Sequence, residues 1–221
     1  NMYYDASNKE TRDPRLYKNV LTNGSTWQKQ KVETFEGGKN KILDGSTKTG
    51  YYLRKYMNPS VSLDPDKPNK LYHHYVLFRY AEILLNYAEA MNEWKGPDAT
   101  AEGCPLSARE ALNQVRDCAD MKHVTENGTD FTAKVRNERR IELAFEGHRF
   151  YDIRRWKIAG LDEVRNLYGV KITKSGTSLS YEKVLLQQMY WNDKMYLFPY
   201  PQNEIYMNPD LGQNPGWSTG N

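Results

Sequence analysis

The clearest pattern in the chain is a helical repeat of apolar residues between positions 74 and 95. Apolar side chains recur at intervals of three and four, on one face of a predicted helix: Leu77, Tyr80, Ala81, Leu84, Tyr87, Ala88 and Met91. Gly96-Pro97 predicts where this helix stops. The first helix of a tetratricopeptide-type repeat has a similar spacing, matched here by Tyr80, Ile83, Leu84 and Tyr87.

A second helix is predicted to begin at Ser107, because Glu110 three residues later completes the pattern of a capping box. Its apolar face comprises Ala108, Ala111, Leu112, Val115 and Ala119. Two such helices form a helical hairpin, and a single repeat cannot bury both of its faces. The pattern therefore predicts partner helices that are absent from this chain.

Two further helices are predicted downstream. The third covers residues 130–145, with the apolar candidates Phe131, Val135, Ile141, Leu143 and Phe145. Gly147 is expected to break or bend it. A short fourth helix follows and carries Phe150, Tyr151, Ile153 and Trp156. Helix should therefore dominate residues 74–157.

The regions on either side lack this periodicity. Residues 168–174 alternate as a strand, and residues 179–185 return after a turn, which predicts a β-hairpin. Residues 199–217 are rich in Pro and Asn and predict an ordered loop that lies over the body. Before residue 70, closely spaced turn signals predict a layer of structured loops with short strands, such as residues 49–56.

Charge and composition exclude several classes of function. The net charge is +3, which indicates no nucleic-acid partner. No apolar run reaches the roughly 18 residues that a membrane-spanning helix needs. The absence of an initiator Met and of a leader segment leaves two interpretations, a cytosolic protein or one whose targeting segment has been removed. Cys104 and Cys118 are too few for a zinc cluster, and Cys118 is expected to be a buried free thiol because Val115 and Ala119 flank it on the helix.

The charged segment of residues 135–157 allows a catalytic and a structural interpretation. Glu138, Glu142 and Glu146 lie four apart on one helical stripe. A carboxylate pair could carry out acid–base steps, as in glycoside hydrolysis. Arginines this close would instead keep the carboxylates ionised, whereas a general acid needs an apolar pocket. We therefore expect structural ion pairs, made by Glu138, Glu142, Arg139 and Arg149.

Motifs for metal, nucleotide or covalent chemistry are weak. Glu146, His148 and Asp152 lie close together in sequence, but a zinc site usually has two His at i, i+4 or a Cys. His73-His74 precedes a helix and is interpreted as a solvated cap region. No glycine-rich loop follows a predicted strand, and no Ser or Cys lies in a nucleophile turn. The residues therefore predict no enzymatic activity and no metal or cofactor.

Aromatic residues in polar loops are the remaining candidates for function. Trp27 lies among small polar residues, and Tyr51, Tyr52 and Arg54 lie in the next ordered stretch. An aromatic ring can cover the C–H face of a sugar, while polar side chains bond to its hydroxyl groups. Each residue could instead anchor its loop to the helical body, and for Trp27 the two interpretations have equal weight. The candidate substrate-binding residues are thus Trp27, Tyr51, Tyr52 and Arg54.

Several motifs, taken together, resemble the SusD/RagB family, surface lipoproteins that work with TonB-dependent transporters in Bacteroidetes-type bacteria. The most specific one is VRNERRIELAFEGHRFYDIRRW at residues 135–156. It is accompanied by RYAEILLNYAEA at 79–90, LNQVR at 112–116, YLFPYPQNEI at 196–205 and QNPG at 213–216. Weaker matches are DPR at 13–15, GSTW at 24–27 and residues 51–56. The motifs occur in the family's order and cover nearly the whole chain.

The resemblance implies a mainly α fold, a SusD-like α–α superhelix with tetratricopeptide-like repeats, a loop-rich cap and a small β-hairpin. It divides the chain into a loop-rich part (1–73), a helical core (74–157) and a hairpin with an ordered tail (158–221). It also implies that an amino-terminal part with a lipid anchor is missing here. Residues 117–121 depart from the Arg-Ala-Gly-like turn of many members, which leaves the end of the local helix open.

The function that the resemblance implies is non-catalytic binding of nutrient glycans at the outer-membrane surface, for delivery to a SusC-like TonB-dependent transporter. No cofactor, metal or nucleic acid is implied, and the membrane is reached only through the lipid anchor of the missing part. The alternative is capture of another nutrient, such as peptides, by the same architecture. Glycan-contacting residues vary among members, so the resemblance assigns no binding residue. The identity and linkage of the glycan stay open.

Overall fold

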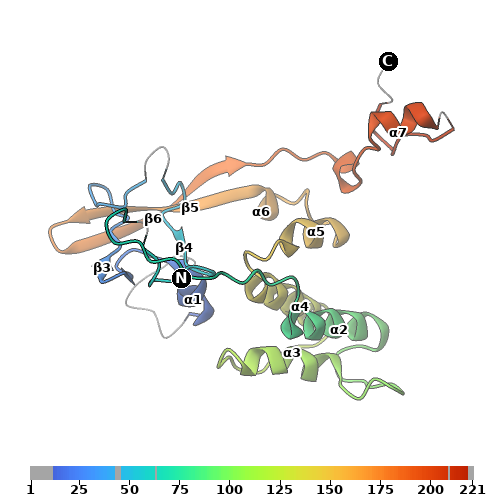
Figure 1. The fold of residues 1–221 in the computed structure, drawn as a ribbon. Helices are drawn as coiled ribbons and strands as arrows, with labels where there is room; N and C mark the ends of the chain where they lie inside the picture. The colour runs from blue at the N-terminus through green and yellow to red at the C-terminus, as the bar shows by residue number, and fades with distance from the viewer. Residues whose placement is uncertain (1–11, 43–45, 63, 209, 219–221) are drawn as a thin grey trace.

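The computed structural model describes residues 12–42, 46–62, 64–208 and 210–218. Within these ranges, helices dominate residues 80–155, and every β-sheet has only two strands. Figure 1 shows the helices gathered on one side and a long β-hairpin extending to the other. The mainly α fold with a small hairpin is therefore confirmed.

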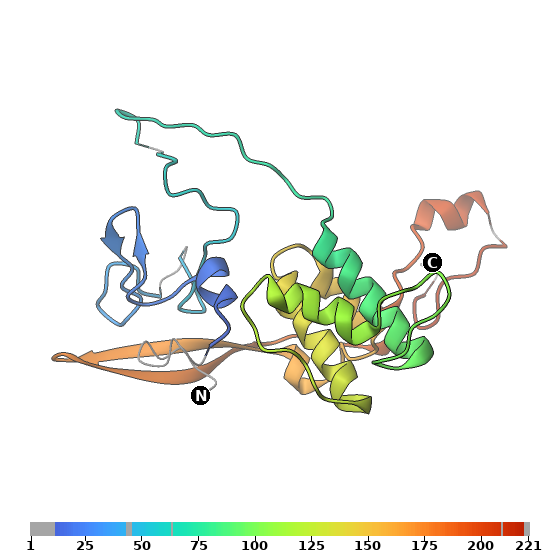
Figure 2. The ribbon, with the colours of Figure 1, turned by 90° about the horizontal axis from the view of Figure 1, so that it is seen from below.

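Three helices form the core of the molecule: α2 (Tyr80–Lys95), α3 (Ala108–Asp117) and α4 (Gly128–Glu142). Helix α2 packs against both α3 and α4, as Figures 1 and 2 show. The buried side chains that they share include Leu84, Leu85, Ala88, Met91, Ala111, Leu112, Val115, Phe131 and Val135. The predicted apolar faces are thus confirmed at the centre of each helix, where burial of apolar surface stabilises the bundle.

Helix α2 begins later than its apolar pattern predicts. Residues 74–79 are irregular, and Leu77, which was assigned to the buried face, is 81% exposed. Arg79 has an extended backbone with a φ of −146°, and its guanidinium binds two glutamates at the end of α4. This anchor fixes the start of the helix at Tyr80. The other end agrees with the prediction, because Gly96 takes a φ of +85° there.

The capping box at the start of α3 is confirmed. The Ser107 hydroxyl accepts a hydrogen bond from the backbone N–H of Glu110, whose carboxylate accepts one from the N–H of Ser107. The prediction for Cys118 is wrong in part, because the thiol is free but exposed. Helix α3 ends at Asp117, so Cys118 lies at the C-cap and no longer on the buried face.

Helix α4 ends at Glu142, three residues earlier than predicted. Phe145 therefore lies beyond the helix, with a φ of +67°, and its side chain is 55% exposed rather than part of the core. Gly147, with a φ of +83°, then turns the chain into α5 (His148–Arg155), as the expected break requires. Trp156 follows directly and is buried.

A short helix, α6 (Asp162–Arg165), leads into the predicted hairpin of β5 (Asn166–Ser175) and β6 (Ser178–Gln188). The two strands are antiparallel, and both extend beyond the predicted residues. Val170 of β5 is buried, and its N–H donates to the carbonyl oxygen of Thr49 at 2.9 Å. The hairpin thereby supports the loops that precede the helical bundle.

The chain before α2 has little regular structure, as predicted. Its elements are α1 (Arg15–Asn19), β1 (Val20–Leu21), β2 (Thr26–Trp27), β3 (Gln30–Lys31) and β4 (Tyr52–Leu53). Strand β1 pairs with β4 and β2 pairs with β3, each pair antiparallel. The stretch 49–56, which was predicted as a strand, is therefore a strand over only two residues.

The carboxyl-terminal tail contains the 3-10 helix η2 (Asp193–Tyr196) and the helix α7 (Gln202–Met207). Figure 1 shows α7 set apart from the helical bundle, and Met207 is 83% exposed. The prediction of an ordered loop that lies over the body is therefore wrong for this part. The start of the tail does dock, because Phe198 stacks on Phe150 of α5 at 5.9 Å between ring centroids.

Candidate functional site

Three glutamates on one stripe of α4 and the turn after it form a network with basic residues. Glu138, Glu142 and Glu146 follow one another at intervals of four residues. Glu138 is buried, and its two carboxylate oxygens accept hydrogen bonds from Arg15 and Arg116. The nitrogen of Arg116 lies 2.6 Å from the carboxylate. The predicted structural pairing of Glu138 is thus confirmed.

Glu142 and Glu146 are also each bound by two cations. Glu142 lies 2.7 Å from Arg15 and 2.6 Å from Arg79. Glu146 lies 2.8 Å from Arg79 and 2.6 Å from Lys55. These cations come from α1, from the loop after β4 and from the residue before α2. The network therefore fastens the loop-rich segments to the helical bundle.

A second network joins α4 to α5 and α2. Arg139 and Asp152 are both buried, and their side chains lie 2.8 Å apart. Asp152 also binds Arg155 at 2.9 Å, and Arg155 pairs with Glu89 of α2. The prediction for Arg139 is confirmed, whereas that for Arg149 is wrong, because it makes no ion pair with any described carboxylate. The nearby acid, Asp152, is already held by two other arginines.

Glu142 and Glu146 are ionised at neutral pH. Burial alone would raise the pKa of Glu142, but hydrogen bonds from Arg15 and Arg79 outweigh it and hold the pKa below its ordinary value of 4.5. The same competition, with Arg79 and Lys55 as donors, lowers the pKa of Glu146. A general acid requires a raised pKa. The network therefore supports the structural interpretation of this segment.

These lowered pKa values predict a loss of stability in acid. Glu142 and Glu146 contribute stability that is fully present above the unfolded pKa of 4.5 and is lost as the pH falls through their folded pKa values. The urea concentration at the unfolding midpoint should therefore change little between about pH 7 and pH 5. It should decrease once the pH is lower than about 4.5.

Replacing Arg79 removes the partner that the two carboxylates share. In Arg79→Gln the folded pKa values move back toward the unfolded value, so the drop in urea midpoint on acidification should shrink. Lys122→Gln, which removes an exposed cation outside the network, should keep the full drop. An acid transition of equal size in Arg79→Gln would contradict this assignment.

The histidines that were considered as ligands have other neighbours. The Nε2 atom of His148 lies 3.6 Å from a carboxylate oxygen of Glu82. His73 lies ahead of α2, where its ring meets Tyr56 edge-on at 5.9 Å between centroids. Among the residues that the structure describes, no group of three or more His, Cys, Asp or Glu side chains is arranged to hold a metal ion.

Trp27 lies on a tight β-hairpin. Strands β2 and β3 pair it with Gln30, and the two turn residues, Gln28 and Lys29, take φ values of 46° and 67°. The Gln28 amide donates to two carbonyl oxygens of the 59–61 loop at 3.1 and 2.7 Å, which docks the tip of the hairpin. Trp27 itself is half-buried, and within the described residues its indole N–H makes no hydrogen bond.

The base of this hairpin is held by buried polar groups. Asn23 accepts a hydrogen bond from the backbone N–H of Thr34 at 2.9 Å. The Ser25 hydroxyl accepts one from the N–H of Thr22 at 3.0 Å. Because both ends of the hairpin are fastened, Trp27 is presented in a fixed position, which lowers the entropic cost of binding a ligand there.

The other candidates lie in and around β4, next to β1, and are half-buried. The Tyr52 hydroxyl donates to a backbone carbonyl at 3.3 Å, and the Arg54 guanidinium donates to another at 2.6 Å. These contacts hold Tyr52 and Arg54 to neighbouring segments that precede the helical bundle. Within the described residues, no hydrogen bond or ring contact joins either of them to Trp27. Trp27 therefore lies on one loop segment and the other candidates on another, and the described contacts do not join them into a single site.

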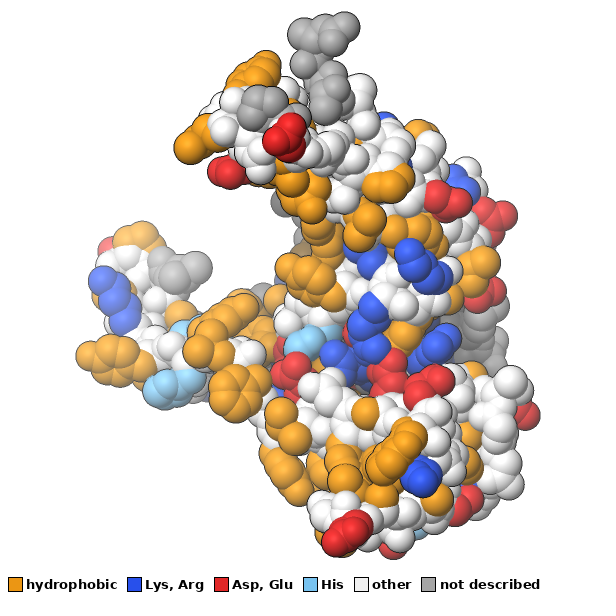
Figure 3. Space-filling view, turned by 90° about the vertical axis from the view of Figure 1, so that its right-hand side faces the viewer, with side chains coloured by type: hydrophobic (Ala, Val, Ile, Leu, Met, Phe, Trp, Pro, Cys, Tyr) orange, Lys and Arg blue, Asp and Glu red, His pale blue; other side chains and the backbone are white. Residues whose placement is uncertain are grey.

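A hollow bordered by exposed aromatic residues is a further feature, which helical spacing does not predict. Figure 3 shows a hollow with charged side chains on its floor and hydrophobic side chains on the surrounding lobes. Strongly exposed aromatic residues include Tyr72, Tyr75 and Phe78 before α2, and Phe198 and Tyr206 in the tail. Tyr75 and Phe78 were missed because they fell inside the stretch 74–95 that was predicted to be helical. The pattern that could have revealed them is the continuous apolar run at residues 75–78, which does not have the spacing of a helix with one buried face.

Comparisons with known proteins agree on one family. The profile of the SusD family matches residues 2–217. A SusD-like protein from Bacteroides fragilis has a similar structure, with a TM-score of 0.74 and 33% identity over 94% of this chain and 40% of that chain. A SusD-like carbohydrate-binding protein from the same species has a TM-score of 0.68 and 30% identity, over 96% of this chain and 44% of that chain.

A curated relative is a SusD-like protein from Formosa agariphila. It is 28% identical over 180 residues, which are 75% of this chain and 28% of that protein. The chain thus spans less than half the length of each of these relatives. The family profile nevertheless extends over the loops, the glutamate stripe and most of the tail. On this match, together with the shared helical architecture, the chain belongs to the SusD family.

Proposed function

We propose that this chain takes part in non-catalytic binding of glycans at the cell surface, for delivery to a SusC-like TonB-dependent transporter. The observation that carries the proposal is the likeness to a SusD-like carbohydrate-binding protein, at 30% identity over 96% of this chain. Trp27 on its fastened hairpin adds a ring of the kind that covers the apolar face of a sugar.

The electrostatics of the glutamate stripe support a binding role without catalysis. Glu138, Glu142 and Glu146 are each bound by two cations, and the pKa values of Glu142 and Glu146 are lowered. Carboxylates held in this way are poor proton donors at neutral pH. Their arrangement instead stabilises the positions of the loops that carry the candidate binding residues.

We place the proposed sugar contact at Trp27, with Tyr51, Tyr52 and Arg54 as companions. The Trp27 ring is half-buried on a hairpin whose tip and base are held by hydrogen bonds, and its indole N–H makes none with a described residue, so it could donate to a hydroxyl group. Tyr52 and Arg54 already bind backbone carbonyls, so their contribution is to shape the wall beside the ring and to offer their remaining donors.

The expected effect of Trp27→Ala is a loss of about 1–3 kcal/mol of glycan binding energy, by analogy with stacking of other rings on aromatic side chains. The thermal midpoint should hardly change. Trp94→Ala is a matched control, because Trp94 is 62% exposed on α2 and outside the loops, and its removal should leave affinity unchanged. Calorimetric titration in the full-length protein measures both. Unchanged affinity with a large drop in the thermal midpoint would make Trp27 a loop anchor.

A glycan array, with a peptide library as a second panel, tests the function itself. Binding confined to glycans, with no release of reducing ends, is the expected result. Binding confined to peptides would favour the alternative cargo, capture of another nutrient by the same fold. Release of reducing ends would replace the proposal with an enzyme.

Attachment to the outer membrane belongs to the same proposal. Among the described residues, no helix is both long and apolar enough to cross a membrane. A lipid anchor on the full-length protein would place the chain at the surface without a spanning helix. Metabolic labelling of the full-length protein with a fatty acid, followed by protease treatment of whole cells, tests this attachment.

A further inference from the structure

A hollow of about 500 Å³ lies between the 33–42 loop and the β5–β6 hairpin. The loop is bound to the edge of the hairpin, because the backbone N–H of Glu36 donates to the carbonyl oxygen of Ile172 at 2.8 Å. Figure 1 shows the loop-rich segment next to this hairpin. The lining combines polar residues with the apolar side chains of Ile42, Ile172 and Val184. Its volume and its mixed lining are typical of a small-molecule site.

One of the lining residues, Thr34, has a buried hydroxyl without a hydrogen-bond partner. The residue is 2% exposed, and its Oγ1 atom bonds to no described residue. Its backbone N–H donates to Asn23, so Thr34 is held at the base of the Trp27 hairpin. An unpaired buried hydroxyl is unfavourable, and rotation about the Cα–Cβ bond can turn it toward a ligand in the hollow.

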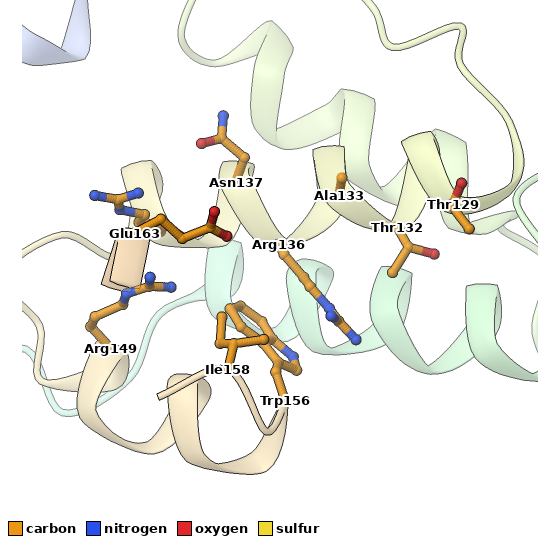
Figure 4. Close-up of a pocket in the computed structure, with 10 residues that line it drawn as sticks. Thr129, Thr132, Ala133, Arg136, Asn137, Arg149, Trp156, Ile158 and Glu163 are labelled. Carbon is orange, nitrogen blue, oxygen red and sulfur yellow. The ribbon is translucent and has the colours of Figure 1, made fainter. Parts of the chain in front are cut away.

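The hollow also carries a positive charge that is not neutralised. Glu36, the acid among its described lining residues, lies 3.1 Å from Lys171. Lys41 lines the same hollow and makes no ion pair with a carboxylate that the structure describes. The hollow between α4 and α5 differs, because Glu163 lies there together with Arg149, as Figure 4 shows. An ammonium group without a counter-charge favours an anionic ligand.

The charges of the chain are distributed in the same sense. Residues 12–73 contain 12 Lys and Arg against 6 Asp and Glu, so their net charge is +6. The hairpin, residues 166–188, contains 3 against 1 and adds +2. Residues 74–165 contain 14 against 16, which gives −2. The loops and the hairpin on either side of the hollow are therefore the positive part of the chain, and they attract anionic ligands.

We propose that this hollow is a subsite for an acidic sugar residue, whose anionic group binds the Lys41 ammonium and one of whose hydroxyl groups bonds to Thr34. Ile42 and Ile172 contact the C–H groups of the ring. The inference rests on the proposed glycan binding and narrows the ligands to glycans that carry carboxylate or sulfate groups. The ammonium of lysine is a point charge that accepts either group.

Matched pairs of oligosaccharides test the subsite in the full-length protein. The acidic members are oligosaccharides of galacturonate and of glucuronate, and a sulfated galactan oligosaccharide. The neutral members are the same chains after carboxyl reduction or desulfation. Lys41→Met removes the ammonium, and Lys41→Arg keeps a positive charge. Lys48→Met is the matched control, because Lys48 is exposed in the same loop segment and does not line the hollow. Calorimetric titration measures each affinity.

The parent protein is expected to bind an acidic member about 10-fold more tightly than its neutral partner, because hydrogen bonds to charged groups are the stronger ones. Lys41→Met should remove this preference, whereas Lys41→Arg and Lys48→Met should keep it. The uronate and sulfate pairs identify which anionic group is recognised. Equal affinity for both members, or a preference that survives in Lys41→Met, would overturn the subsite and leave the proposed glycan binding in place. The absence of binding to every oligosaccharide would overturn both.

Thr34→Val tests the second contact, because valine keeps the shape of threonine and lacks its hydroxyl. Affinity for the acidic oligosaccharide should fall about threefold to tenfold, the effect of one hydrogen bond. The thermal midpoint should not fall, since the hydroxyl has no described partner to lose. A lower thermal midpoint with unchanged affinity would overturn this contact, because the hydroxyl would then stabilise the fold and not the ligand.

Discussion

Replacing Glu138 with glutamine is expected to destabilise the 221-residue chain by about 3–5 kcal/mol, the usual cost of removing one partner from a buried ion pair. The side chain of Glu138 is 1% exposed, and Arg15 and Arg116 both depend on its charge. The amide of glutamine has the same shape, but it leaves Arg116 without its carboxylate partner and Arg15 with only Asp13 and Glu142. The loss should appear as a lower urea midpoint with an unchanged slope.

Glu93→Gln is the matched control for this measurement. Glu93 lies on α2 and is exposed, so removing its charge should change the free energy of unfolding by less than about 0.5 kcal/mol. If the two variants unfolded at the same urea concentration, the glutamate stripe would not be the fastening between the loops and the bundle.

Arg139→Gln is expected to cost a similar amount, about 3–5 kcal/mol, because it leaves Asp152 buried with less compensation. The two side chains are 6% and 4% exposed, and the guanidinium of Arg139 also donates to Asn86 at 2.6 Å. The variant should therefore loosen α5 from α4 and α2 at the same time. Hydrogen exchange should show faster opening of α5 than in the parent chain.

The neighbouring substitution Arg140→Gln is an informative control in the 221-residue chain. Arg140 is exposed and makes no ion pair with a described residue, so its loss should leave the thermal midpoint of this chain almost unchanged. Equal destabilisation by the two substitutions would mean that general charge on α4, and not the Arg139–Asp152 pair, sets its stability.

Much of the fold could be predicted from local pattern. Helices α2 and α3 were found because apolar side chains recur with helical spacing and because Ser107 and Gly96 mark their ends. The hairpin was found because residues 168–174 alternate as a strand and residues 179–185 return after a turn. These signals are local, so a single sequence contains them in full.

The residues at which helices begin and end were less predictable where contacts with residues distant in sequence determine them. The start of α2 is fixed by Arg79, whose partners lie at the end of α4, and no local pattern contains that contact. Phe145 and Cys118 were misplaced because each helix ends a few residues earlier than its apolar pattern. The exposed end of the tail was misplaced because the pattern does not say what a segment docks against.

The ionic network was predictable in kind but not in its connections. Spacing by four placed Glu138 and Glu142 on one stripe, and the surrounding arginines indicated pairing. Arg15, which bridges both, lies more than 120 residues away in sequence, so only the fold could identify it. Arg149 was assigned a partner from proximity in sequence, but Asp152 was already taken by Arg139 and Arg155.

The candidate binding residues stay a prediction, and so does the division of the chain at residues 73 and 157. Loop composition pointed to Trp27, and the structure adds the fastened hairpin that carries it. Tyr52 and Arg54 gained contacts that loop composition could not indicate, since their acceptors are backbone carbonyls. Ligand contacts depend on the shape of assembled loops, which a single sequence does not encode locally.

The most direct test of the central claim combines titration with analysis of the glycan afterwards. The full-length protein is titrated calorimetrically with an oligosaccharide selected on the array, and the recovered glycan is sized by chromatography. The account predicts saturable binding and a glycan of unchanged length after prolonged incubation. A shortened glycan, or the absence of binding to every glycan while peptides bind, would contradict it.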